Sequence, residues 1–116
     1  MYTRVCYLYR DASNYKFWGY FILDGAVLRD EAKPYLIDGE WIIPEVIGLD
    51  PLRPIEKTED DHRYHELHEF EEVGVSEAAG IGAPLCSAGE FIRRLKKVNM
   101  RWDELFCGLM LGPATR

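Results

Sequence analysis

The N-terminal segment that decides the fold reads Y-T-R-V-C-Y-L-Y-R (residues 2–10), D-A-S-N (11–14) and Y-K-F-W-G-Y-F-I-L-D (15–24). In the first part, β-branched or aromatic residues occupy positions 3, 5, 7 and 9, which share one face of an extended chain. The last part is dense in aromatic and β-branched residues, and D-A-S-N is rich in turn-forming residues. The segment therefore predicts an aromatic β-hairpin with strands over 2–10 and 15–24.

The second strand is apolar on both faces, which predicts a central strand covered on both sides. Gly19 interrupts it and indicates either a bulge or a close approach of another segment. Further along, residues 40–43 (E-W-I-I) predict a short strand. Residues 30–37 favour a short helix capped by Asp30 and an irregular loop about equally.

The C-terminal part of the chain contains the clearest helix. Ser87 and Glu90 form the S-x-x-E pattern of a capping box, and apolar residues follow at helical spacing, which predicts a helix over 88–99. Residues 101–106 predict a further turn or short helix that docks Trp102 and Phe106. Residues 44–57 are expected to form a proline-rich loop held on the core, and residues 74–86 a Gly/Ala-rich loop.

Together these elements predict an α+β fold. An antiparallel sheet led by the hairpin carries the capped C-terminal helix on one face, in a single domain over residues 1–116. The expected core consists of Phe17, Trp18, Phe21, Ile22, Leu23, Trp41, Ile43, Phe91, Ile92, Leu95 and Val98.

Composition narrows the class of protein. The apolar fraction of 47% and the charged fraction of 29% are those of a globular chain. No apolar run reaches the roughly 20 residues of a membrane span, and the N-terminus resembles a strand more than a signal peptide. The three cysteines, at 6, 86 and 107, form no C-x-x-C pair, so we expect reduced thiols, with Cys6 and Cys107 buried. These features predict a soluble, cytoplasmic protein.

All three histidines lie in T-E-D-D-H-R-Y-H-E-L-H-E-F-E-E-V (58–73), spaced by three residues. The apolar residues of this segment are also spaced by three, which matches neither the helical period of about 3.6 residues nor the strand period of two. It favours a strand over 64–73, with an acidic helix as the alternative. On a strand His65 would face away from His62 and His68. If the rings converged instead, Asp61, His62, His65 and His68 would be candidate ligands for zinc or another divalent metal.

The hairpin turn is a second candidate site. Arg10, Asp11, Ser13, Asn14, Lys16 and Trp18 could hold a phosphate or a nucleobase, with the aromatic rings as stacking surfaces. The alternative interpretation is that the turn residues only bond to the local backbone.

Two weaker candidates lie near the C-terminal helix. Cys86 precedes the helix N-terminus, which favours a thiolate, but no nucleophile signature surrounds it. The basic residues Arg93, Arg94, Lys96, Lys97 and Arg101 are expected on the solvent side of this helix. They could bind nucleic acid, which the net charge of −6 opposes, or the acidic 59–72 segment of a second copy in a homodimer.

Two sequence patterns, W-I-I-P-E-V-I-G-L (41–49) and D-x-H-x-x-H-E-L (60–67), precede the capped helix and suggest a resemblance to known proteins. The chain resembles small bacterial proteins of an uncharacterised family over residues 7–99. The resemblance implies a bacterial, cytosolic, single-domain protein and no assigned activity. We therefore expect a non-catalytic binding or regulatory module that acts through a protein or small-molecule partner. The alternatives are a metal-binding, hydrolytic protein and a nucleic-acid binder.

Overall fold

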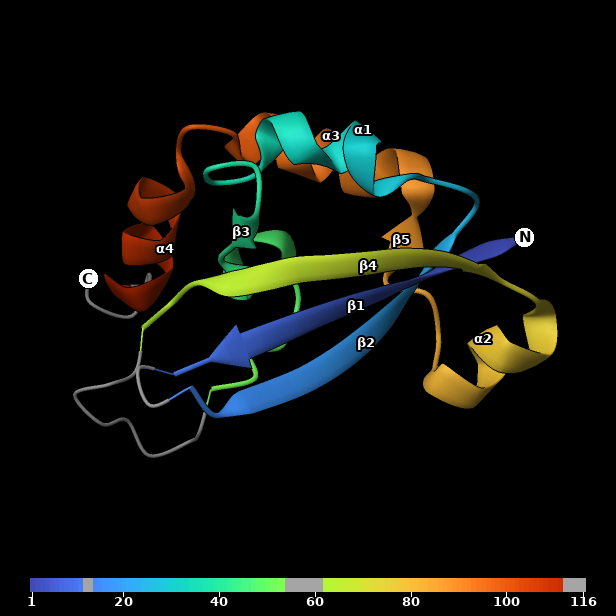
Figure 1. Ribbon diagram of the computed structural model, residues 1–116. Helices are drawn as coiled ribbons and strands as arrows, with labels where there is room; N and C mark the ends of the chain where they lie inside the picture. The colour runs from blue at the N-terminus through green and yellow to red at the C-terminus, as the bar shows by residue number, and fades with distance from the viewer. Residues whose placement is uncertain (12–13, 54–61, 112–116) are drawn as a thin grey trace.

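In the described part of the chain, the sheet has five strands in the order β3-β4-β1-β2-β5 (Figure 1). Its strands are β1 (Tyr2–Arg10), β2 (Lys16–Asp24), β3 (Trp41–Ile42), β4 (His65–Val73) and β5 (Cys86–Ser87). The computed structural model describes residues 1–11, 14–53 and 62–111. All pairings are antiparallel except the short parallel pair of β2 with β5. The α+β prediction and the N-terminal hairpin are thus confirmed, with a mixed sheet.

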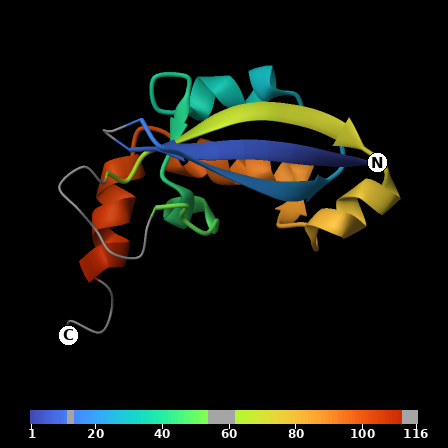
Figure 2. The same ribbon diagram turned by 60° about the horizontal axis from the view of Figure 1, so that its bottom comes forward.

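Helices lie at both ends of the sheet and over one of its faces. They are α1 (Arg29–Ala32), α2 (Val75–Ile81), α3 (Ala88–Val98) and α4 (Trp102–Leu111), with 3-10 turns η1 (Lys33–Tyr35) and η2 (Pro44–Ile47). Helices α1 and α3 lie together, α4 stands near the end of the sheet where β1 ends, and α2 lies near the opposite end (Figures 1 and 2).

The capped helix α3 forms as predicted. The Ser87 hydroxyl accepts a hydrogen bond from the Glu90 N–H at 3.1 Å, which satisfies one of the free donors at the helix N-terminus. The Glu90 carboxylate does not complete a capping box; it pairs with Arg93 and Arg94. Phe91, Leu95 and Val98 are buried. Helix α4 extends past the predicted 101–106 turn and buries Trp102 and Phe106 as expected.

Two other helical segments differ from the sequence-based expectation. Helix α1 begins after Leu28, whose N–H donates to the Glu31 carboxylate at 2.7 Å, so Asp30 is not the cap. The 74–86 segment was predicted to be a loop, but residues 75–81 form α2. Its buried Ala78 packs on Ile22 and Val73, a contact too small to produce an amphipathic pattern in so short a helix.

Strand β1, and not β2, is the central strand of the sheet. It pairs along its length with β2 and with β4, whereas β2 meets β5 only at Leu23 and Asp24. Among the described strands, none pairs with the outer edge of β2 in the part near the hairpin turn. Phe17 and Trp18 were predicted to be core residues, but they are 38% and 46% exposed. Trp41 and Ile92, also predicted in the core, are only partly buried.

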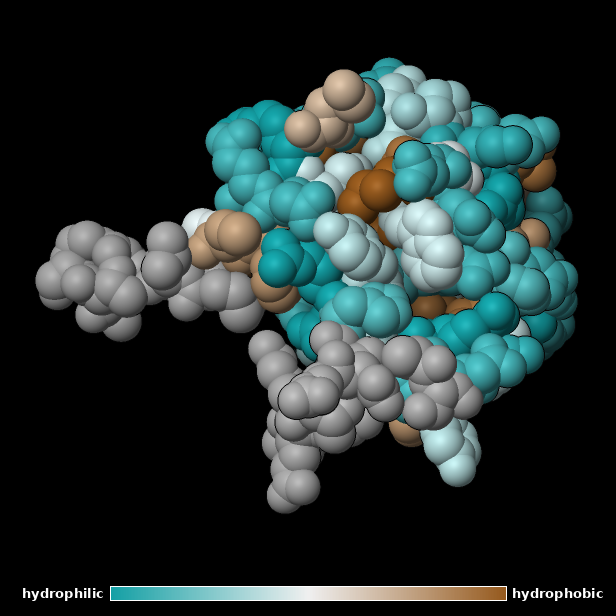
Figure 3. Space-filling view, turned by 60° about the vertical axis from the view of Figure 1, so that its left-hand side comes forward, coloured by the Kyte–Doolittle hydropathy of each residue, from teal (hydrophilic) through white to brown (hydrophobic). Residues whose placement is uncertain are grey.

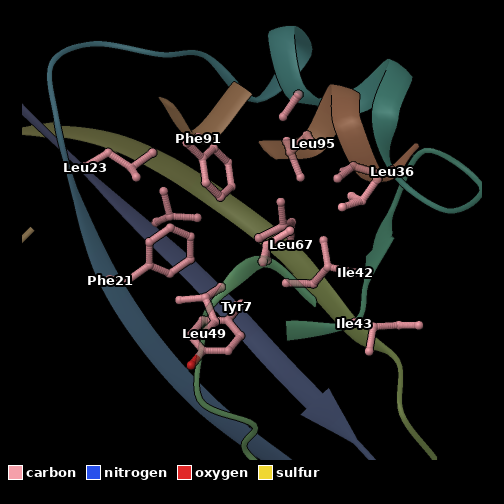
Figure 4. Packing of buried hydrophobic residues seen from close by; sticks show 14 of the residues in the cluster. Tyr7, Phe21, Leu23, Leu36, Ile42, Ile43, Leu49, Leu67, Phe91 and Leu95 are labelled. Atoms are coloured by element: carbon pink, nitrogen blue, oxygen red, sulfur yellow. The ribbon is translucent and has the colours of Figure 1, made fainter. Parts of the chain in front are cut away.

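The core lies between the sheet and the helices α1, α3 and α4. Figure 4 shows side chains of β1, β2, β4 and α3, among them Tyr7, Leu67 and Phe91, directed into one interior. The predicted core residues Phe21, Leu23, Ile43, Leu95 and Val98 belong to this cluster. Ile22 is also buried, but on the opposite face of the sheet, under α2.

A bulge in β4 sets which side chains reach this core. Cys6 pairs with Glu69 and Tyr7 with Leu67, so His68 is an extra residue in the ladder. Such an insertion places residues that are three apart on one face. Leu67 and Phe70 consequently both contact the core. The strand over 64–73 is confirmed. On a regular strand His68 and Phe70 would share a face, and this expectation from the sequence is wrong, because the bulge leaves His68 on the outer face and Phe70 against the core.

The proline-rich loop is held on the sheet by side chains of the strands. The Tyr7 hydroxyl donates to the Asp50 carbonyl at 2.7 Å, and Leu49 is buried. A Cβ on Gly19 would lie 2.8 Å from a Leu52 methyl carbon and 2.9 Å from the Tyr7 ring. Since β1 and β2 pair in continuous register, Gly19 serves a close approach and not a bulge. Residues 54–57 of this loop lie outside the described part of the chain.

We expect Gly19→Ala to lower the free energy of unfolding by about 1–3 kcal/mol, as overpacking typically does. The Tyr7 ring is anchored by its hydroxyl and cannot retreat freely. Gly80→Ala in α2, where nothing lies within 4 Å of the added carbon, should instead add about 0.5–1 kcal/mol through helix propensity. Urea denaturation of both variants measures the difference. Equal effects of the two substitutions would contradict this role of Gly19.

Candidate functional site

His65 is a buried residue of the sheet. Its Nε2 accepts a hydrogen bond from the Leu52 N–H at 2.9 Å, and its Nδ1 lies 3.2 Å from the Arg63 carbonyl oxygen. These two bonds fit one neutral tautomer, in which Nδ1 carries the proton. Burial lowers the pKa of His65 to about 4, because a charged ring would lose its hydration. His65 thus fastens the proline-rich loop to β4.

His62 and His68 occupy different surroundings. The His62 Nε2 bonds to the Arg10 carbonyl oxygen at 2.9 Å, and its Nδ1 accepts from the Tyr64 N–H at 3.1 Å. The His68 ring, at the bulge, lies edge-on to Trp18 with centroids 5.3 Å apart, on the sheet face that points away from the core.

The structure therefore brings two of the predicted metal ligands close together. The rings of His62 and His65 each lie 5.0 Å from the Tyr9 ring, but their nitrogens bond to backbone groups. His68 is on the other face, and Asp61 lies outside the described residues. Within the described ranges, no three His, Cys, Asp or Glu residues are placed to hold a metal ion.

The pKa of His65 predicts how stability depends on pH. Below about pH 6.5 the unfolded ring takes up a proton, whereas the folded ring does so only near pH 4. Protons therefore favour the unfolded chain in this window, and above it His65 contributes no pH dependence. Between pH 6.5 and 4 the free energy of unfolding should fall by up to about 3 kcal/mol from this residue.

Urea denaturation at several pH values tests this expectation. His65→Gln should lack the extra decline below pH 6.5, because glutamine does not titrate. His68→Gln, at an exposed position, should retain it. If the His65→Gln variant lost stability with falling pH as steeply as the native chain, the explanation would be wrong.

The described polar residues of the hairpin turn either build the turn or lie exposed on the strands. The Asp11 carboxylate accepts from the Tyr15 N–H at 2.9 Å, and Asn14 adopts a positive φ of 67°. Both residues are used to build the turn. Arg10 and Lys16 are exposed partners in the strand register, Ser13 lies outside the described residues, and Trp18 points to the outer sheet face.

That outer face carries a groove of about 430 Å³. We call it the outer groove, and it is lined by Arg4, Cys6, Trp18, Tyr20, His68, Glu69 and Glu71. These residues come from three adjacent strands, β1, β2 and β4, so the strand register alone brings them together. Of these residues, only Trp18 and His68 were predicted from the sequence as candidate site residues.

Contacts between its own side chains organise the outer groove. The Arg4 guanidinium bonds to the Glu71 carboxylate at 2.7 Å and lies 5.5 Å from the centre of the Tyr20 ring. The hydrogen bond with Glu71 raises the pKa of Arg4. Glu69 is exposed, whereas Cys6 is buried, and burial raises the pKa of its thiol. The groove thus presents aromatic rings and carboxylates above a neutral thiol.

A second pocket, of about 440 Å³, lies near β3 and is lined by Ile37, Asp38, Trp41, His62 and Tyr64. We call it the aromatic pocket. Sequence reasoning found His62 here, but as a metal ligand. It missed the others, because Trp41 and Asp38 are far from Tyr64 along the chain. Trp41 was predicted to be a core residue, but it is only partly buried and lines this pocket.

The features near α3 differ from their expected roles. Burial raises the pKa of Cys86, which opposes the activation expected at a helix N-terminus. Cys107 was predicted to be buried but is exposed. Arg94 is half-buried and donates to the Ile47 carbonyl at 3.0 Å, so it faces η2 and not open solvent. Arg101 pairs with Glu104.

Comparison with protein-family models, curated protein sequences and solved structures finds no match to this chain. The resemblance to an uncharacterised bacterial family therefore stays a prediction. Among the helices in the described ranges, none combines the length and the apolar character needed to cross a membrane.

Proposed function

We propose that this chain is a non-catalytic binding module whose outer groove docks an extended basic segment of a protein partner. The observation that carries the proposal is the pair of half-exposed rings, Trp18 at 46% and Tyr20 at 53%, beside the carboxylates of Glu69 and Glu71. Exposed aromatic side chains supply much of the binding energy of protein interfaces, and carboxylates steer and select basic partners.

The charge of the groove favours a basic segment over nucleic acid. The rings alone could stack on bases, but Glu69 and Glu71 would repel phosphates. The single arginine of the groove, Arg4, is already paired with Glu71. The net charge of −6 adds to this preference.

The surroundings of the Cys6 thiol and of the His65 ring support a binding role more than a catalytic one. The thiol of Cys6 is neutral, because burial raises its pKa. His65 has both ring nitrogens engaged with backbone groups, so a proton transfer from it would break a structural bond. These groups are suited to holding the sheet and loop in place.

A titration with a short, end-blocked peptide of alternating lysine and leucine tests the proposal. The indole N–H resonance of Trp18 should shift in a saturable way, and the resonance of buried Trp102 should not. A peptide of alternating glutamate and leucine serves as the control and should bind far more weakly. Absence of a Trp18 shift with the basic peptide would overturn the proposal.

Two matched variants locate the interaction. Glu69→Gln should weaken binding of the basic peptide about two- to fivefold at low salt, the usual worth of an exposed ion pair. Glu72→Gln makes the same change of charge on the opposite face, since Glu72 pairs with the inward-facing Thr3, and should have a smaller effect. Equal losses would mean that net charge, and not the outer groove, drives the binding.

A further inference from the structure

We propose that the aromatic pocket binds an organic ammonium cation, in a site separate from the outer groove. The pocket is lined by three π-systems, from Trp41, His62 and Tyr64, and by one carboxylate, that of Asp38. Aromatic rings around a cavity attract a cation through the negative potential of their faces, and quaternary ammonium groups are the ligands typical of such arrangements. The four side chains thus supply ring faces and a counter-charge.

The side chains of His62 and Tyr64 and the backbone at Trp41 are held in place before any ligand arrives. The His62 ring is fixed at both nitrogens, by the Arg10 carbonyl and the Tyr64 N–H. The Tyr64 hydroxyl donates to the Asp103 carboxylate at 2.7 Å. Trp41 closes a tight turn with Ile37, whose N–H donates to the Trp41 carbonyl at 2.9 Å. Rings that are already positioned lose little entropy when a ligand binds.

The charges of the residues around the pocket are compatible with a bound cation. His62 accepts at Nδ1 and is bonded through Nε2 to a carbonyl, an arrangement that fits the neutral ring. The neighbouring Arg63 does not line the pocket, and its charge is paired. Its guanidinium lies 4.6 Å from the centre of the Phe106 ring and bonds at 3.2 Å to the Asp103 carboxylate oxygen that also accepts from Tyr64. Among the described residues that line the pocket, none is a lysine or arginine.

The size of the pocket is compatible with a small organic group. Its volume of about 440 Å³ falls in the range of roughly 300–1,000 Å³ of small-molecule sites. On the side of the molecule that carries α4, hydrophobic surface forms small patches enclosed by hydrophilic residues (Figure 3). Two sources of the same chemistry fit, a free quaternary amine and the methylated side chain of a lysine.

The three tryptophans separate this inference from the proposed function. Trp41 lines the aromatic pocket, Trp18 lines the outer groove and Trp102 is buried in the core. In a choline titration of the full chain, the Trp41 indole resonance should shift in a saturable way while those of Trp18 and Trp102 stay constant. A shift confined to Trp18 would overturn the inference but leave the outer groove as a binding site. The basic-peptide titration tests the outer groove independently.

A neutral control isolates the role of charge. The carbon isostere of choline, in which a quaternary carbon replaces the nitrogen, has nearly the same shape and no charge. It should bind about tenfold more weakly than choline if the rings and Asp38 recognise the cation. Equal affinities would show that the pocket is only hydrophobic, and the inference would fail.

Variants test the pocket without relying on one substitution. Asp38→Asn should weaken choline binding about threefold and is expected to fold, because asparagine tolerates the positive φ of 52° at this position. Asp24→Asn, an equal change of charge at the end of β2, should leave the affinity unchanged. Trp41→Leu should reduce it more than tenfold. Loss of affinity in the Asp24→Asn variant to the same extent as in Asp38→Asn would contradict the inference.

Peptides distinguish the two sources of the ligand. A peptide with one trimethyllysine should shift Trp41 at lower concentration than choline if the natural ligand is a protein side chain, and the unmodified lysine peptide should bind more weakly. If choline binds as tightly as the trimethyllysine peptide, the free amine is the favoured source. If neither choline nor the trimethyllysine peptide perturbs Trp41, the aromatic pocket does not bind ammonium cations.

Discussion

Strand β1 is the constraint on which the rest of the structure depends, because it hydrogen-bonds to a neighbour along both of its edges. Its side chains are buried on both faces: Val5 and Tyr7 towards the helices, Cys6 and Leu8 on the other side. The inward face anchors the proline-rich loop through the Tyr7 hydroxyl. The outward face forms the floor of the outer groove. Both the core and the proposed binding face are thus set by one strand.

The parts of the fold that could be predicted from the sequence are those encoded within a few neighbouring residues. The hairpin follows from alternation and a turn cluster, and α3 follows from Ser87 and the apolar spacing after it. The exposure of Trp18 could not be predicted from the residues around it, because it depends on how far β5 extends along β2. In the structure β5 pairs only with Leu23 and Asp24. Helix α2 was missed for a related reason: its one buried contact, Ala78, leaves no periodic signal.

The candidate site was only partly predictable, because it depends on strand pairing. The bulge at His68 changes which face each later residue of β4 occupies. The local sequence contains no feature that predicts this extra residue. The three histidines are spaced by three residues, and the favoured strand would turn His65 away from His62 and His68. In the structure His65 fixes a loop, His62 bonds to the last residue of β1 and His68 contacts Trp18. Arg4, Tyr20 and Glu71 meet across three strands, and only the register reveals them.

The two edges of β1 also differ in when they can be satisfied during synthesis. The edge that faces β2 closes with a turn of a few residues, so it forms locally and early. The other edge requires β4, since Tyr2 pairs with Val73, and it stays unpaired until β4 has been synthesised. An open strand edge invites pairing with another chain. The nascent protein therefore has a period, before β4 is available, in which neighbouring molecules can pair with this edge of β1.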